Sequence, residues 1–351
     1  MRLKFPKPRL RNREKNDKNG INVVKRLLVF LGFTFPILGQ QDSTKKSALH
    51  LYAYAEAYYL LAPSNTSPYL KDPIFFNHSQ ANQVDLNLGI LGMAIKKGPI
   101  NVQVSGMLGT YALRNYAHEP LIWRKIYEMN ITYQLAKKWS MLVGIFPSHI
   151  GFESAKNAEN WTLSRSFVAE NSPYFESGIG FYFKPNPAWT YSLFALRGWQ
   201  QIQAFRPALG TQIVHQAANS WTWNSSGFIG DEGNGLRLFH DFYVLVPLSK
   251  NLTAILISDI GYQKDFWHGE ALMIQAILSD KWKVAGRIEQ FSDEKSILLN
   301  PQNAIQSASI GVNFSPFPKI LLRTEWRVLQ ANNQKSDVHS PEYLFALVLG
   351  K

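Results

Sequence analysis

The chain has no cysteine, few charged residues and no apolar run as long as twenty residues. The absence of cysteine excludes disulfide bonds, thiolate metal sites and cysteine nucleophiles. A polytopic helical membrane protein needs several apolar runs of about 20 residues, so that class is excluded as well. With 351 residues, 46% of them apolar and 13% aromatic, the chain is neither disordered nor a disulfide-stabilised miniprotein. Its length suits two ordinary domains or one large β-barrel.

The positive charge is concentrated at the N-terminus. Ten of the 37 Lys and Arg residues lie within residues 1–26, and they account for most of the net charge of +12. A basic arm alone would suggest binding to nucleic acid or to an anionic surface. However, the apolar stretch from Leu27 to Gly39 follows directly, and this order is typical of a secretory signal peptide. An internal hydrophobic helix of a cytoplasmic protein is the alternative.

We therefore expect residues 1–39 to be a basic arm plus signal peptide, cleaved near Gly39, and residues 40–47 to be a short linker. The arm is longer than a usual signal-peptide start, which leaves the true start codon open. Export through a signal peptide also argues against a nucleic-acid partner.

After the linker, polar and apolar residues alternate with a period of two. Residues 128–135 (EMNITYQL) place four polar side chains on one face of a strand and four apolar side chains on the other. Residues 84–90, 102–108 and 307–314 alternate in the same way. Counting such stretches predicts about sixteen strands between residues 48 and 349.

The connections between the predicted strands alternate in length. Short turns on one rim and long loops on the other are typical of an up-and-down antiparallel barrel in an outer membrane. The predicted longer links are residues 61–81, 113–122, 148–173, 200–208, 230–235, 264–269, 292–302 and 331–341.

A closed transmembrane sheet explains further features of residues 48–351. Several predicted strands reach the 9 to 11 residues that cross a bilayer at a tilt, and closure pairs every backbone group in hydrocarbon. Aromatic residues collect near the strand ends, where outer-membrane barrels carry aromatic girdles. Two soluble β-sandwich domains of a secreted protein are the alternative architecture, but they have no reason to sort their loops by length.

Three sequence blocks carry a resemblance to a known family. Residues 147–154 (PSHIGFES), 161–166 (WTLSRS) and 169–174 (AENSPY) resemble the signature of the Bacteroidetes outer-membrane β-barrel porin family, OmpL-like. This resemblance implies an outer-membrane channel for the passive diffusion of small hydrophilic solutes, with membrane lipid as its surroundings. The chain departs from the usual barrel pattern because it ends on Gly350-Lys351 rather than on an aromatic residue, which questions its assembly efficiency.

The longest predicted link, residues 148–173, is the third long loop in order. General porins fold this loop inward as a constriction, and the analogy is one of fold only. We expect its charged residues to lie at the constriction, with the three glutamates facing the pore. These residues are Glu153, Lys156, Glu159, Arg165 and Glu170.

Further charged residues fall on the predicted inner face of the wall, because an Arg on the lipid face would cost roughly 2 to 4 kcal/mol at the midplane. Arginines on late strands that face acids on the loop would set a transverse field across the pore. Alternatively, these charges pair with one another and brace the wall. The predicted wall residues are Glu56, Asp85, Arg124, Glu128, Glu176, Asp241, Asp259, Arg287, Glu289, Arg323, Glu325 and Arg327.

The sequence contains no convincing enzyme or metal motif. His240 and Asp241 are adjacent, so on a strand they point to opposite faces and cannot form a dyad. Residues 231–235 lack the spacing of a calcium loop, and glycine-rich phosphate loops are absent. We therefore expect no enzyme, metal or cofactor.

A closed barrel that acts as a binding or scaffold subunit of a surface complex remains the alternative function. The solute, its charge, the openness of the pore and a homo-oligomeric state are left open.

Overall fold

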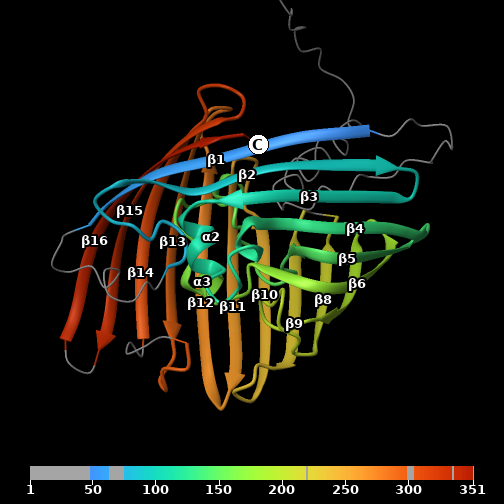
Figure 1. The fold of residues 1–351 in the computed structure, drawn as a ribbon. Helices are drawn as coiled ribbons and strands as arrows, with labels where there is room; N and C mark the ends of the chain where they lie inside the picture. Colours follow the sequence, from blue (N-terminus) through green and yellow to red (C-terminus); the bar gives the residue numbers. More distant parts are fainter. Residues whose placement is uncertain (1–47, 63–74, 219, 299–303, 334–335, 351) are drawn as a thin grey trace, which may run out of the picture.

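The computed structural model describes residues 48–62, 75–218, 220–298, 304–333 and 336–350. The expected signal peptide and linker, residues 1–47, lie outside the described residues. Sixteen antiparallel strands form one closed barrel in which each strand pairs with its neighbours in sequence, and the last strand pairs with the first (Figure 1). The predicted fold class is confirmed.

In chain order the strands are β1 (Ala48–Leu61), β2 (Val84–Lys97), β3 (Ile100–Leu108), β4 (Ile126–Ala136), β5 (Trp139–Pro147), β6 (Phe175–Asn186), β7 (Trp189–Leu196), β8 (Ala208–Gln216), β9 (Thr222–Asp231), β10 (Leu236–Pro247), β11 (Leu252–Gln263), β12 (Asp265–Ile277), β13 (Trp282–Ser292), β14 (Ala304–Phe314), β15 (Ile320–Asn333) and β16 (Ser336–Leu349).

Within the described residues, short helices lie only in the connections between strands. They are α2 (Thr110–Asn115), η3 (Trp123–Lys125), η4 (Asn157–Glu159) and α3 (Phe167–Glu170). None of the helices in the described part of the chain is long and apolar enough to cross a membrane.

Two expected long links are wrong. β11 and β12 are separated by Lys264 alone, where residues 264–269 were expected to form a loop. β15 and β16 continue through most of residues 331–341 and pair as far as Asn333 and Ser336. Polar residues in these segments are typical of loops, but the backbone ladders continue through them, with Asp265 paired to Gln263 and Asn333 to Ser336.

The two faces of each strand differ in exposure, as the alternation predicts. On β13, Ile288 is 59% exposed, whereas its neighbours Arg287 and Glu289 are 2% and 7% exposed. The outer face carries exposed aliphatic and aromatic side chains such as Leu91 and Phe181. This arrangement matches a wall with lipid outside.

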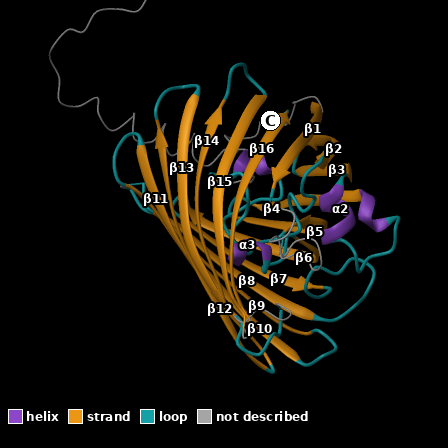
Figure 2. Ribbon diagram, turned by 90° about the vertical axis from the view of Figure 1, so that its left-hand side faces the viewer, coloured by secondary structure: helices purple, strands orange, loops and turns teal. Residues whose placement is uncertain are grey.

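The barrel interior is not uniformly polar. Ile255, Met273 and Phe291 on the inner face of β11–β13 pack in one buried cluster with Trp161 and Phe167 of the β5–β6 connection. Figure 2 shows α3, which belongs to this connection, inside the ring of strands. Residues 148–174, here called the inner loop, therefore fold into the barrel.

Candidate functional site

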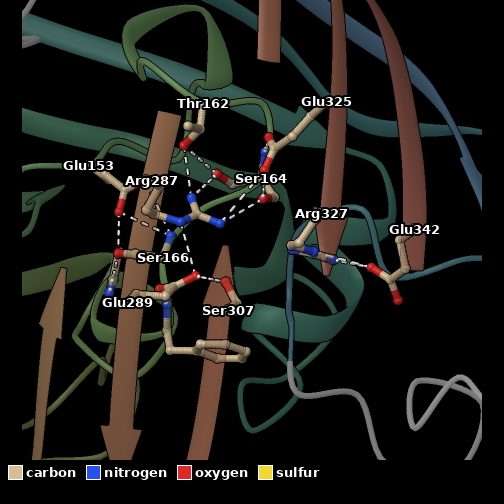
Figure 3. Close-up of polar contacts among 12 residues, drawn as sticks. Glu153, Thr162, Ser164, Ser166, Arg287, Glu289, Ser307, Glu325, Arg327 and Glu342 are labelled. Carbon is tan, nitrogen blue, oxygen red and sulfur yellow. Dashed lines mark hydrogen bonds and ion pairs between the residues drawn. The ribbon is translucent and has the colours of Figure 1, made fainter. Parts of the chain in front are cut away.

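Arg287 of β13 joins the inner loop to the barrel wall (Figure 3). Its Nε lies 2.9 Å from Glu289 Oε1, and its Nη2 lies 3.7 Å from Glu325 Oε1 of β15. The same guanidinium donates to Thr162 Oγ1 at 2.8 Å, to the Ser164 carbonyl at 2.7 Å and to Ser164 Oγ at 2.9 Å. The buried guanidinium of Arg287 thus contacts both the wall carboxylates and the oxygens of the loop through its several N–H donors.

The two wall carboxylates also accept hydrogen bonds from the inner loop. Glu325 accepts from the Ser164 backbone N–H and from Ser164 Oγ, both at 2.6 Å. Glu289 accepts from the Phe167 backbone N–H at 2.6 Å and from Ser307 Oγ at 2.6 Å. Hydrogen bonds to charged groups are the stronger kind, so the loop backbone is fixed at two points of β13 and β15.

Arg323 of β15 makes a second attachment, to loop oxygens without charge. It donates to the carbonyl oxygens of Asn160 and Trp161 at 3.0 Å and 2.9 Å, and its Nη1 also contacts Asn157. Its Nε donates to Asn313 Oδ1 at 2.6 Å, and the Asn313 amide donates to the Trp161 carbonyl at 3.0 Å. Arg323 as a whole is 3% exposed, which leaves little of its side chain to face a solute.

Glu153 works inside the inner loop rather than at its surface. Its carboxylate accepts from the Ser166 backbone N–H at 3.1 Å and contacts the Ser166 hydroxyl. Ser166 Oγ in turn accepts from the Ala169 N–H at 3.2 Å and caps α3. Burial raises the pKa of Glu153 above its usual value, against the lowering effect of the nearby Arg287 and Arg165.

Glu170, the last residue of α3, and Arg165, which precedes its N-cap, are also buried. Glu170 accepts from the backbone N–H of Phe76 at 2.8 Å, which joins the inner loop to the β1–β2 connection. The Arg165 guanidinium lies 3.6 Å from the centre of the Tyr174 ring and donates to the Ala169 carbonyl at 2.9 Å. Both groups fix the loop and are shielded from the lumen.

Lys156 and Glu159 are the predicted loop residues that keep contact with solvent. Their side chains form an ion pair of 3.1 Å and are 26% and 21% exposed. Lys156 also lies 5.8 Å from the centre of the Tyr127 ring on β4. Burial alone would lower the pKa of Lys156, but the carboxylates of Glu159 and Glu128 outweigh this and raise it.

His149 anchors the start of the inner loop. Its Nδ1 lies 2.7 Å from Glu176 of β6, and its Nε2 lies 3.1 Å from the Gly227 carbonyl of β9. Its own carbonyl accepts from Gln212 at 2.7 Å and from Ser226 at 3.0 Å. Because both ring nitrogens face acceptors, the imidazolium satisfies both contacts. Burial alone would lower the pKa of His149, but Glu176 outweighs it and raises the pKa.

Other predicted wall residues also have polar partners in the interior. Asp241 and Asp259 are cross-strand partners, and the Asn224 amide donates to Asp241 at 2.8 Å. Glu56 Oε1 lies 2.5 Å from His78 Nε2, and Arg327 Nη2 lies 2.5 Å from Glu342 Oε2 of β16. Figure 3 shows the latter pair beside the contacts of Arg287.

The structure places almost all predicted wall residues on strands, with their side chains inside. Arg124 is the exception, since it lies in η3 and donates to the carbonyls of Glu119 and Ala117. The prediction that Arg124 lies on the wall is wrong, because the Pro120 carbonyl accepts hydrogen bonds from the backbone N–H groups of Trp123 and Arg124 and a helical turn forms there. Asp85 is half-buried and bonds the N–H of Leu86. A pore-lining role for the remaining residues stays a prediction.

Sequence reasoning missed the uncharged residues that complete these contacts. Thr162, Ser164 and Ser166 supply hydroxyls, and Asn157 and Asn160 supply amides and carbonyls. The one available signal was the hydroxyl-rich run of residues 162–166 (TLSRS) within a long loop. Within the described residues, no group of three His, Asp or Glu side chains is arranged to hold a metal ion.

Comparisons with known proteins agree with the barrel. No curated protein matches the chain. The outer membrane channel DcaP of Acinetobacter baumannii has a TM-score of 0.61 at 12% identity, covering 90% of this chain and 100% of that chain. The anion-selective porin from Comamonas acidovorans has a TM-score of 0.58 at 9% identity, covering 87% and 100%. OmpT of Vibrio cholerae has a TM-score of 0.56 at 7% identity, covering 90% and 100%.

These likenesses show the fold, and a family model identifies the family. The model described as "Putative beta-barrel porin-2, OmpL-like" matches residues 48–344, which is nearly the whole described barrel. The protein is therefore a channel of the bacterial outer membrane, and it belongs to the OmpL-like family of β-barrel porins.

Proposed function

We propose that this porin conducts small hydrophilic solutes by passive diffusion and prefers anions. The observation that supports the preference is the set of lysines on the inner face at the rim of short turns. Lys96, Lys184 and Lys283 occupy the same faces of their strands as the buried Ile90, Tyr182 and Arg287. Among the described strands, no Asp or Glu faces inward at this rim.

The rim of short turns corresponds to the periplasmic side of an outer-membrane barrel. Lys97, Lys137, Lys138, Lys250 and Lys319 lie at the same rim and are exposed. Their only acidic neighbour in the described turns is Asp280. A mouth lined by charges of one sign raises the local concentration of counter-ions, so small anions would be enriched here.

The route for solutes follows the inner face of the early strands. Gln103, Thr132, Gln134 and Ser140 on β3–β5 are polar, uncharged and half-buried, whereas the wall of β11–β15 is covered by the inner loop. Lys156 and Glu159 are the loop charges nearest to this face, through Tyr127 and Glu128. We infer that this ion pair is the constriction that a solute meets.

The test is electrical recording of the purified, folded protein in planar bilayers. The expected result is discrete conductance steps and, in a tenfold gradient of potassium chloride, a reversal potential displaced toward that of chloride. A protein that is folded by circular dichroism but forms no conductance would refute the channel. A conductance with a cation preference would refute the charge assignment alone.

Further proposals concern the whole protein. We infer a signal peptide in residues 1–39 that is cleaved near Gly39, a single barrel domain in residues 48–351, an origin in Bacteroidetes, and no catalytic activity. N-terminal sequencing of the mature protein tests the cleavage site. An OmpT of Vibrio cholerae is described in a trimer form, and an oligomer of this chain is proposed by analogy.

A closed barrel that serves as a binding subunit of a surface complex is the second candidate. The buried apolar cluster between the inner loop and β10–β14 favours it, because this cluster fills part of the interior. Stable copurification of a partner together with absent conductance would support this function over the channel.

A further inference from the structure

Arg237 of β10 differs from the buried arginines of the wall. Arg287 and Arg323 are buried, and both donate to oxygens of the inner loop. Arg237 is only half-buried, and its hydrogen bonds go to a neutral side chain, that of Gln263 on β11. Within the described part of the chain, the arginines that form ion pairs are Arg287 and Arg327. The charge of Arg237 is therefore not neutralised by a carboxylate in direct contact.

Gln263 occupies only one edge of the Arg237 guanidinium. Its Oε1 accepts from Nε at 3.0 Å and from Nη2 at 2.6 Å. The other edge, formed by Nη1 and the second hydrogen of Nη2, has no acceptor among the described residues. Two parallel N–H groups of this kind match the two oxygens of a carboxylate or a phosphate.

Two tryptophans fix the position of this guanidinium. Its central carbon lies 4.8 Å from the centre of the Trp199 ring and 5.7 Å from that of the Trp267 ring, and a cation over an indole is attracted by the ring. Trp267 lies close against β11 because residue 261 is glycine, where an added Cβ would lie 2.1 Å from the indole Cε2. The guanidinium is therefore held in place by side chains before a solute arrives.

The same group contains a second donor without an acceptor. The indole Nε1 of Trp267 is buried and has no hydrogen-bond partner within the described residues. Buried donors of this kind are rare in folded proteins. An oxygen atom bound beside Arg237 would give this N–H an acceptor.

The group lies at the extracellular entrance of the barrel. Arg237 is the second residue of β10, at the rim opposite the lysine-bearing short turns, and it shares the inner face with the buried Phe239. Arg206 also lies here, since its Nη1 contacts the Glu232 carbonyl. The Glu232 carboxylate accepts from the Trp199 backbone N–H at 2.9 Å. Two arginines and one carboxylate leave this part of the entrance positive.

We propose that Arg237, Trp199 and Trp267 form a binding site for the carboxylate or phosphate group of an anionic solute. This inference rests on the proposed function and deepens it, because the lysines of the periplasmic rim attract any anion, whereas this site selects by shape. The unoccupied edge of the guanidinium donates two parallel hydrogen bonds to the oxyanion, while Gln263 and the indoles keep its plane fixed. Chloride has no second oxygen and gains less from this geometry.

The experiment measures how benzoate and phenyl phosphate block the chloride current in planar bilayers. At least one probe is expected to block the wild type. Arg237→Gln is expected to raise the half-blocking concentration about tenfold, because hydrogen bonds to a charged group are lost. Arg237→Lys keeps the charge but not the paired donors, and it should raise this concentration several-fold. The matched control Arg114→Gln removes an arginine of α2 at the same rim and should leave the block unchanged.

A second measurement does not depend on conductance. Either probe should change the tryptophan fluorescence of the folded protein in detergent, and Arg237→Gln should abolish this change. A wild type that responds to neither probe, or an Arg237→Gln variant that responds like the wild type, would overturn the site. Binding without any conductance would refute the proposed channel and leave the site standing. A response to one probe alone would support the site and show which oxyanion it takes.

Discussion

The two halves of the barrel differ in what covers their inner faces. In β1–β8 the outer connections are long, as at residues 109–125, 148–174 and 197–207. In β9–β16 they are mostly short, and Lys264 alone joins β11 to β12. The longest connection of the first half lies against the inner wall of the second half. The second wall therefore holds the middle of the loop, whereas β6 and β8 of the first wall hold only its start at His149.

The buried charges of the wall and the lysines of the rim have different roles. Arg287, Arg323 and Glu325 of the second half are at most 3% exposed, and each is bonded to the inner loop. Lys96 and Lys184 of the first half lie at the open rim. A buried ion pair contributes more to fixing one arrangement than to net stability. We therefore regard the buried set as the determinant of the loop position.

Removal of Arg287 should cause the largest loss of stability among these variants. Arg287→Ala leaves Glu289 and Glu325 buried without their cation, and breaking a buried pair in this way costs about 3 to 5 kcal/mol. We expect urea unfolding in lipid vesicles to show a loss of this size, together with noisy conductance from a released loop. The matched control is Arg124→Ala in the first half, which loses only bonds to backbone carbonyls.

Equal losses of unfolding free energy in Arg287→Ala and Arg124→Ala would contradict the proposed difference between the two halves. Equal losses would mean that the second wall does not hold the inner loop more firmly than the first half holds its own connections.

Neutralising the rim should affect selectivity and leave stability nearly unchanged. The triple variant Lys96→Gln, Lys184→Gln, Lys283→Gln removes the inward lysines, and we expect the anion-to-cation permeability ratio to fall several-fold. Exposed charges contribute little to stability, so unfolding should shift by less than about 1 kcal/mol. Reversal potentials measure the first effect, and an unchanged ratio would show that the selectivity arises elsewhere.

A smaller effect should appear with pH at the start of the inner loop. The pKa of His149 lies above its usual value of about 6.5, so its charged contact with Glu176 is complete at lower pH. As the pH rises through the raised pKa, the imidazolium is lost and this anchor weakens. Asp241 of β10 also faces this group and favours the charged form.

We expect brief fluctuations of the current to become more frequent above neutral pH in the wild type. In His149→Gln they should no longer depend on pH. A wild-type current that is insensitive to pH from 6 to 9 would contradict a protonated anchor.

The fold could be predicted from the sequence because a lipid-facing wall leaves a strong pattern. Alternation with a period of two and the order of turns indicated sixteen strands, and the closed barrel confirms them. Link lengths were harder to predict, since polar residues such as those in 264–269 and 331–341 occur both in loops and at the ends of strands. Local composition does not distinguish these two cases.

The site was predictable only in part. Charge and alternation correctly placed Arg287, Glu289, Arg323 and Glu325 inside the barrel. Their partners could not be predicted, because contacts such as Arg323 with Asn157 join residues far apart in sequence through a folded loop. Whether a charge faces water or a loop depends on that packing. The sequence therefore supported both a transverse field and a braced wall, and the hydrogen bonds favour bracing.

The most direct test of this account is single-channel recording of Arg323→Met. This variant removes one of the two attachments of β15 to the inner loop, leaves that of Glu325 to Ser164, and keeps most of the side-chain volume. We predict larger and noisier conductance steps with an unchanged reversal potential, because the arginine holds the loop and does not face the solute. A steady conductance of wild-type size with a reversal potential shifted toward cations would contradict the account and make Arg323 a charge of the pore lining.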